Sequence, residues 1–198
     1  MIEIPGIIGE IVEKRLVTIE QAKKKRPEPE IRLIAENASV PLSLQRTIAS
    51  KSGVSLIAEM KRSSPSAGSL DPELDPAHRA GLYSAAGATA ISVLTEYDYF
   101  SGSIEDLAAA SIIARASRVP VLRKDFIVDE YQIHEARAAG ADCILLIIAC
   151  LDPKQYTDLF NISTSMGMDV LVEVFDEPEL DIALTEVEPH IVLSLIHI

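Results

Sequence analysis

From residue 54 onward, short apolar segments alternate with segments of helical pattern. Six segments have the length and apolar character of strands, at 54–60, 90–94, 119–122, 143–148, 170–174 and 191–196. Five segments with a helical pattern separate them, at 76–86, 104–117, 130–139, 153–166 and 178–185. This order with short turns predicts parallel strands joined by right-handed crossovers, with helices on the faces of the sheet. The fold class is therefore α/β, either an open doubly wound sheet or a (β/α)8 barrel.

Two observations favour the barrel. No glycine-rich phosphate loop follows the first strand, which disfavours the dinucleotide-binding form of the open sheet. Charged residues stand at the C-terminal ends of several strands, and in a barrel that rim is the active face. A complete barrel needs eight strands and about 250 residues, whereas only six strands are found. We therefore expect an incomplete TIM barrel whose first and last strands are unpaired edges, with poor stability and a tendency to aggregate.

The chain divides into three parts in this interpretation. Residues 1–50 form an N-terminal helical extension, with helices expected at 5–25, 30–36 and 43–51 and a charged break, KKKRPEPE, at 23–30. Residues 51–192 form the partial barrel. Residues 193–198, LSLIHI, look foreign to the pattern that precedes them.

Charge and composition limit the classes of partner. The 198 residues contain 18 Lys and Arg and 30 Asp and Glu, a net charge of −12. This charge argues against nucleic acid or an anionic membrane as a partner, and it requires a local basic site for any anionic substrate. No apolar run approaches 18 residues and the first residues lack the order of a signal peptide, so we expect a cytoplasmic protein. The two cysteines, Cys143 and Cys150, lack a zinc or redox spacing and are expected to be buried thiols.

Four charged residues at strand ends are the candidate catalytic group: Glu59, Lys61, Lys124 and Glu173. Side chains alternate along a strand with a period of two, so all four can face the barrel axis. Two lysines and two carboxylates around one opening would suit proton transfer to and from a substrate. The alternative is that they form structural ion pairs or solvated rim charges.

Other polar and aromatic residues allow two interpretations each. The serines at 63–66 are either a plain turn or donors to an anion. The aromatic segment 97–100 either covers a bound ring or packs over the barrel end. His78, His134 and His190 lack metal-ligand spacing and are expected at the surface, so no metal site is predicted.

Several long segments resemble one family. They are IAEMKRSSPSAG at 57–68, ISVLTEYDYFSGSIEDL at 91–107, VPVLRKDFIVDEYQIHEARAAGAD at 119–142, ILLIIACL at 144–151 and GMDVLVEVFDE at 167–177. In this order they resemble indole-3-glycerol phosphate synthase, a (β/α)8 enzyme of tryptophan biosynthesis. The resemblance implies a carboxy-lyase that converts 1-(2-carboxyphenylamino)-1-deoxyribulose 5-phosphate into indole-3-glycerol phosphate, CO2 and water without a cofactor.

The resemblance also implies roles for particular residues. Lys124 would act as an acid toward the ketone or hydroxyl oxygen. Lys61 would hold the carboxylate and phosphate side of the substrate, and proton donation by Lys61 is left open. Glu59 and Glu173 would orient the substrate and remove protons. A further set would bind the substrate, with Ser64 at the phosphate and with Phe100, Phe126 and Leu145 around the anthranilate ring.

The sequence departs from the family after the sixth strand. The family continues with an asparagine-bearing segment and with phosphate contacts from two further strands, so this fragment is expected to be impaired or inactive. Two alternatives remain at this point. One is another phosphate-binding barrel such as phosphoribosylanthranilate isomerase, although the first strand lacks the cysteine which that reaction uses. The other is a non-catalytic half-barrel that pairs with another chain. Fusion to, or association with, another tryptophan-pathway enzyme is also left open.

Overall fold

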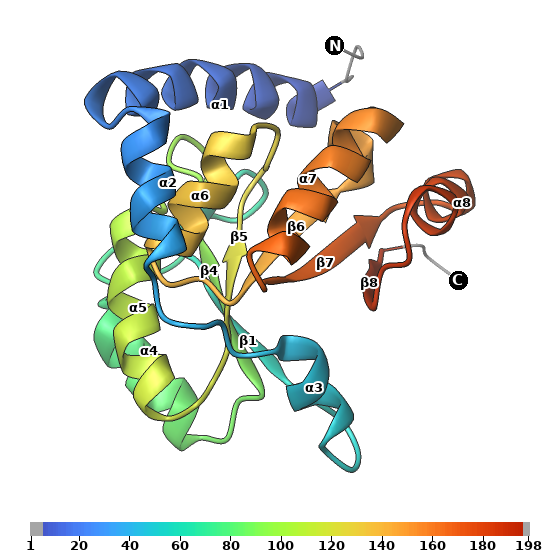
Figure 1. Ribbon diagram of the computed structural model, residues 1–198. Helices are drawn as coiled ribbons and strands as arrows, with labels where there is room; N and C mark the ends of the chain where they lie inside the picture. The colour runs from blue at the N-terminus through green and yellow to red at the C-terminus, as the bar shows by residue number, and fades with distance from the viewer. Residues whose placement is uncertain (1–5, 196–198) are drawn as a thin grey trace.

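The computed structural model describes residues 6–195, which form a parallel sheet covered by helices (Figure 1). Three helices come first, and the remaining helices alternate with the strands of the main sheet. The helices are α1 Gly6–Lys25, α2 Glu28–Glu36, α3 Leu44–Ala49, α4 Pro76–Ala85, α5 Ile104–Ala116, α6 Glu130–Ala138, α7 Pro153–Ser165 and α8 Glu177–Glu186, with a 3-10 turn, η1, at Ile148–Cys150. The strands are β1 Ile57–Met60, β2 Ser63–Ser64, β3 Gly68–Ser69, β4 Ala90–Leu94, β5 Val121–Lys124, β6 Cys143–Ile147, β7 Asp169–Val174 and β8 Ile191–Ser194.

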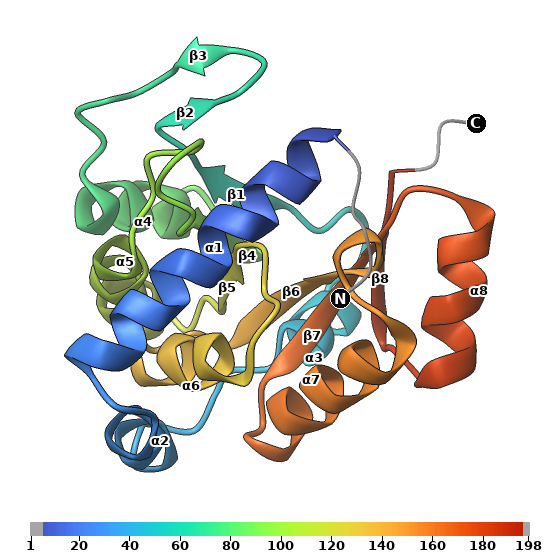
Figure 2. The ribbon, with the colours of Figure 1, turned by 90° about the horizontal axis from the view of Figure 1, so that it is seen from above.

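The main sheet has six parallel strands in the order β1-β4-β5-β6-β7-β8. Each strand pairs with the next one along the chain, as a barrel requires, and the sheet is curled (Figure 2). Within residues 6–195, β1 and β8 each have one neighbouring strand only. The predicted α/β fold, an incomplete TIM barrel with a helical extension, is confirmed in this part of the chain.

The helices of the barrel begin at capping residues that the sequence places directly before them. Asp75, Ser103, Asp129, Asp152 and Asp176 each accept a backbone N–H from the first turn of the following helix. Such caps satisfy backbone donors that a helix cannot pair internally. They fix where each helix starts, and therefore how far each loop extends beyond the C-terminal end of its strand.

Strand boundaries differ from the prediction in two places. The first strand begins at Ile57 rather than at residue 54, and Val54 is 98% exposed. The third strand begins at Val121, directly after Pro120, which lacks the N–H that a sheet ladder needs. It then runs through Lys124, so this lysine is the last residue of the strand itself.

The serine-rich segment and the C-terminal segment also form strands. Ser63–Ser64 and Gly68–Ser69 pair as a short antiparallel hairpin where a plain turn or an anion site was expected. Two residues of the segment interpreted as foreign, Leu193 and Ser194, belong to β8, and the Leu195 N–H donates to the Val174 carbonyl at 2.9 Å. Residues 196–198, the rest of that segment and of the predicted last strand, lie outside the described residues.

The N-terminal helices contact opposite ends of the sheet. Helix α1 crosses the C-terminal ends of the strands, and α2 packs beside α6 (Figures 1 and 2). The segment that leads into α3 reaches the other end, where the Leu42 N–H donates to Asp142 at 2.7 Å and the Ser43 hydroxyl donates to Asp169 at 2.9 Å. In residues 6–195 no helix is both long and apolar enough to cross a membrane.

Candidate active site

A small cavity of about 80 Å³ opens where the central strands end. Its walls come from the ends of β1, β4, β5 and β6 and from the loops that follow β4 and β5. The lining residues are Glu59, Lys61, Leu94, Phe100, Lys124, Asp125, Phe126, Leu145 and Ile147. Six of the eight residues predicted from the sequence therefore surround one space, at the end of the sheet where barrel enzymes bind their substrates.

Lys124 and Glu173 form an ion pair in the interior of the sheet. The Lys124 ammonium lies 3.3 Å from a Glu173 carboxylate oxygen, and the Glu173 residue is only 4% exposed. Glu173 does not line the cavity itself. Its carboxylate accepts a hydrogen bond from Lys124, which does line the cavity. The two strands that carry the pair each have neighbours on both sides, which fixes the direction of both side chains.

Glu59 and Lys61 form the second pair, at the edge of the sheet. Their ammonium and carboxylate lie 2.8 Å apart, and about a third of each side chain is exposed, 33% for Lys61 and 35% for Glu59. The hydrogen bond shows that the two side chains share one face, as the period of the strand predicts. The cavity thus has an exposed charge pair on one side and a buried pair on the other.

An apolar slot lies between the two pairs. The rings of Phe100 and Phe126 face each other with centroids 6.3 Å apart and an interplanar angle of 36°. Leu145 is fully buried behind them, and Leu94 and Ile147 complete the wall. The last two were not predicted, although Ile147 lies two residues after Leu145 on the same strand and therefore on the same face.

Ser64 is the predicted residue that the structure keeps away from this space. It belongs to β2, where its hydroxyl accepts the Ala67 N–H at 3.1 Å and lies 3.5 Å from the Ser66 hydroxyl. It does not line the cavity. Its assignment to a phosphate stays a prediction.

A buried ionic network adjoins the cavity through Asp125, which is one of its lining residues, and this network was missed in the sequence. Asp125 accepts hydrogen bonds from Arg15 at 2.9 Å, Thr95 at 2.5 Å and Arg123 at 3.1 Å, and from the Phe126 N–H at 2.8 Å. Burial favours the neutral acid, but Arg15 and Arg123 outweigh it and hold the pKa of the Asp125 carboxyl below its usual value. Asp125 therefore holds the backbone between Lys124 and Phe126 in place.

Helix α1 takes part in this network because Arg15 lies on its buried side. Ile11, Val12, Arg15 and Ile19 are its buried residues. The helix makes three further polar contacts with loops of the barrel: Lys14 stands 4.5 Å from the centre of the Tyr99 ring, the Tyr99 hydroxyl donates to Glu10 at 3.4 Å, and Lys23 pairs with Asp129 at 2.8 Å. The N-terminal extension is thus bound to the same loops that line the cavity.

The cysteines were predicted to be buried free thiols and three histidines to lie at the surface. The prediction for one histidine, His134, was wrong. Cys143 and Cys150 are free and buried as expected, and burial raises the pKa of the Cys150 thiol to about 12, which keeps it protonated. His78 and His190 are exposed. His134, expected at the surface, is only 4% exposed because α2 packs over its helix.

Comparison with known proteins identifies the family. The family model for indole-3-glycerol phosphate synthase matches residues 8–192, which is most of the chain. The chain belongs to this family. The predicted function, a carboxy-lyase of tryptophan biosynthesis that acts on a small phosphorylated substrate, agrees with the match, and neither alternative from the sequence is favoured.

Curated relatives in the indole-3-glycerol phosphate synthase family are similar over most of this chain. One from Desulfosudis oleivorans is 41% identical over 180 residues, 89% of this chain and 67% of its own length. One from Dehalococcoides mccartyi is 42% identical over 90% of this chain and 69% of its own. One from Mycolicibacterium gilvum is 49% identical over 155 residues, which are 78% of this chain and 56% of its own length. The chain therefore spans between 56% and 69% of the length of these relatives.

A solved structure supports the fold but not the function. The crystal structure of the citrate synthase SbnG covers 77% of this chain and 65% of its own, with a TM-score of 0.52 and 17% sequence identity. At that identity the likeness concerns the fold alone. The assignment to the indole-3-glycerol phosphate synthase family rests on the sequence matches.

Proposed function

We propose that this chain catalyses the ring closure of 1-(2-carboxyphenylamino)-1-deoxyribulose 5-phosphate to indole-3-glycerol phosphate in the cavity at the strand ends. This differs from the impaired or inactive fragment expected from the sequence, because six of the eight expected site residues meet in that cavity. The observation that carries the proposal is the arrangement of two lysine–glutamate pairs on either side of an apolar slot. The reaction needs both features, because a planar ring must be held against a ketone while protons move at its oxygen. We also propose that the reaction takes place in the cytoplasm.

In the proposed mechanism the slot folds the substrate. The anthranilate ring lies against Phe100, Phe126 and Leu145, so that the ring carbon that bears the carboxylate approaches the ketone carbon. Offset or tilted aromatic contacts favour such a placement over water. Lys61, at the exposed side of the cavity, pairs with the carboxylate and lies toward the phosphate, so that a local cation binds the anion despite the net charge of −12.

Lys124 acts as the acid in this mechanism. The ring carbon attacks the ketone carbon, a carbon–carbon bond forms, and Lys124 protonates the oxygen as negative charge builds on it. The carboxylate then leaves as CO2, which restores the aromatic ring. Lys124, reprotonated from solvent, then gives a proton to the hydroxyl, which leaves as water. The neighbouring carbon gives a proton to Glu173 or Glu59, which completes the pyrrole ring. The sequence of steps is redox-neutral, so that it needs no electron carrier.

The test is conversion by the purified 198-residue chain. We expect indole-3-glycerol phosphate and CO2 to appear in equal amounts, and Lys124→Met to lower the rate while leaving the fold, monitored by circular dichroism, unchanged. Lys154→Met is the matched control, because Lys154 is an exposed lysine on α7 that does not line the cavity. A folded chain that releases no product, or a Lys124→Met variant as active as the control, would contradict the proposal.

A further inference from the structure

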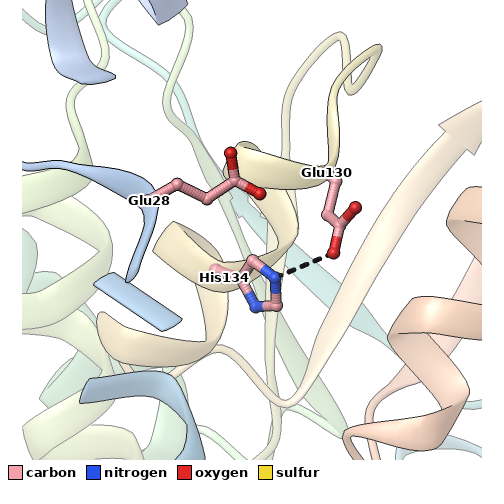
Figure 3. Close-up of side chains that lie close together, drawn as sticks. All are labelled: Glu28, Glu130 and His134. Carbon is pink, nitrogen blue, oxygen red and sulfur yellow. Dashed lines mark hydrogen bonds and ion pairs between the residues drawn. The ribbon is translucent and has the colours of Figure 1, made fainter. Parts of the chain in front are cut away.

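A second cluster of ionisable residues lies outside the cavity, where the N-terminal extension meets the barrel. Glu28 is the first residue of α2, Glu130 is the first residue of α6, and His134 lies one turn further along α6 (Figure 3). One ligand atom from each residue lies within 4.8 Å of the other two. The His134 Nε2 atom is 3.2 Å from a Glu130 carboxylate oxygen, and the Glu28 carboxylate lies above the same ring (Figure 3).

The charge of this cluster is not balanced by the basic residues around it. Within residues 6–195, Glu28 makes no hydrogen bond or ion pair, and Glu130 makes one with His134 only. The nearby cations have other partners: Arg26 pairs with Glu30 at 3.4 Å, Arg32 with Glu36 at 3.0 Å, and Lys23 with Asp129 at 2.8 Å. The helix dipoles favour a carboxylate at each first turn. They do not explain why two carboxylates from different helices converge on one buried imidazole.

We propose that Glu28, Glu130 and His134 bind one divalent transition-metal ion of the Zn²⁺ class, which ties α2 to α6. One imidazole nitrogen and two carboxylate oxygens suit Zn²⁺, whereas Ca²⁺ and Mg²⁺ prefer oxygen ligands only. Glu130 and His134 are four residues apart on one helix, a spacing that directs both side chains to the same side. The ion would therefore join one residue of the extension to two residues of the barrel.

The surroundings leave room for a solvent ligand. A groove of about 410 Å³ runs between α2, α6 and α7, and Glu130 and His134 are part of its wall. A three-residue site open to solvent completes its coordination with water. Arg32 and Arg137 also line the groove, but Arg32 is paired with Glu36 and Arg137 donates to the carbonyls of Ala38 and Ser39.

The second nitrogen of His134 sets the strength of binding. When Nε2 binds the metal, Nδ1 must carry the proton, and Nδ1 is buried without a hydrogen-bond partner among the described residues. A ligating histidine usually donates that proton to an acceptor, and loss of such a partner weakens binding about 10–100-fold. The site is therefore weaker than a structural zinc site by about that factor, and it stabilises the contact between helices rather than creating the fold.

The experiment is a titration of the metal-free 198-residue chain with Zn²⁺ by calorimetry and with Co²⁺ by visible absorption. We expect one ion per chain, a Co²⁺ spectrum without the charge-transfer bands of thiolate ligands, and a rise in Tm on addition of Zn²⁺ that a chelator reverses. Glu28→Gln and Glu130→Gln should each weaken binding at least about tenfold, since even an outer partner has an effect of that size. Glu28→Gln should change the metal-free Tm only slightly, because Glu28 is exposed, has no partner in the described chain and contributes only through the dipole of α2.

Two matched controls separate this site from adventitious binding. Glu13→Gln changes an exposed glutamate of α1, and His78→Ala removes an exposed histidine of α4. Both should bind Zn²⁺ like the parent chain. Absence of binding, binding that the Glu28 and Glu130 variants retain, or an equal loss in the controls would overturn the site. Binding that leaves Tm unchanged would overturn its role in joining the two helices.

Discussion

The two lysine–glutamate pairs of the cavity have the same chemistry but different surroundings. Lys124 and Glu173 come from strands inside the sheet, with side chains 24% and 5% exposed. Glu59 lies on the edge strand β1 and Lys61 directly follows its last residue, with side chains 35% and 33% exposed. The difference arises from the number of neighbouring strands, since β5 and β7 have two each and β1 has one in the described part of the chain.

This comparison indicates how an incomplete sheet supports a site. An interior strand holds its side chains by pairing on both sides, whereas an edge strand needs other contacts. Here the loop after β4 supplies them: the Ser63 N–H donates to the Phe100 carbonyl at 3.3 Å, and Arg62 pairs with Asp106 at the start of α5. The interior pair should therefore dominate catalysis and stability, and the edge pair should depend on that loop.

The largest expected effect is on the steady-state kinetics of variants of the two lysines, which should differ in kcat and in KM. Lys124→Met should lower kcat about 10²–10⁴-fold, because it removes a proton donor that acts in the transition state. Lys61→Met should mainly raise KM, because the proposed role of Lys61 is to hold the charged substrate in the ground state as well. Steady-state rates over a range of substrate concentrations measure both. An equal change in kcat for the two variants would remove the distinction between the pairs.

The next effect concerns the buried network beneath the interior pair. Asp125→Ala should lower the free energy of unfolding by about 3–5 kcal/mol, because it leaves the buried Arg15 and Arg123 without their shared carboxylate. Urea unfolding measures this loss. Asp158→Ala is the matched control, since Asp158 forms an exposed ion pair with Lys154 and should change stability by less than about 1 kcal/mol.

The pH dependence of stability in a second variant at this residue, Asp125→Asn, gives a second measurement. The pKa of Asp125 is lower in the folded chain than its ordinary value of 3.8. Its ionised form therefore stabilises the fold at pH values above 3.8, and that contribution is lost as the pH falls below this value. The difference in stability between the parent chain and Asp125→Asn should shrink between pH 7 and pH 3. A difference that is constant with pH would show that Asp125 is not ionised in the fold.

Much of this architecture could be predicted because its signals are local. The alternation of strands and helices, the capping residues and the two-residue period of β1 and β6 each depend on neighbouring residues. The Arg15–Asp125 contact could not be predicted in the same way, since the two residues are 110 positions apart. A partial signal existed, because Arg15 falls in the helical stripe of Ile11, Val12 and Ile19, where a lone charge requires a buried partner.

The errors also have physical causes. β5 begins at Val121 rather than at residue 119, because Pro120 has no N–H to donate in the sheet ladder. His134 was expected at the surface, because nothing in its own helix shows that α2 covers it. The hairpin at residues 63–69 was expected as a plain turn or an anion site, because the pairing of two such short strands depends on how the segment folds back on itself.

A smaller effect tests the loop that supports the edge strand. A Cβ at Gly102 would lie 2.2 Å from the Leu94 carbonyl oxygen, a backbone atom that cannot move without shifting the end of β4. Gly102→Ala should lower the free energy of unfolding by about 1–3 kcal/mol. Gly81→Ala is the control, since its Cβ would meet only Ile113 at 3.8 Å and the change should stabilise α4 by about 0.5–1 kcal/mol. Equal effects of the two changes would show that the loop has room to adjust.

The smallest effect is the coupling energy within each pair, measured by double-mutant cycles in urea unfolding. The shorter N–O distance, 2.8 Å against 3.3 Å, makes the coupling stronger in the edge pair. This difference in distance changes the Coulomb energy by only about a fifth. Burial favours the interior pair, and the effective dielectric differs between buried and exposed sites by a factor of several. We therefore expect the Glu59–Lys61 coupling to be about 0.2–1 kcal/mol and the Lys124–Glu173 coupling to be larger.

Salt distinguishes the two couplings further. The edge pair is open to solvent ions, so its coupling should fall as salt is raised from low concentration to about 1 M, where the Debye length is about 3 Å. The interior coupling should change less, because Glu173 is shielded from solvent by the strands on either side. If both couplings fell in parallel, the interior pair would be exposed to solvent in solution, and β7 would then behave as an edge in spite of its pairing with β8.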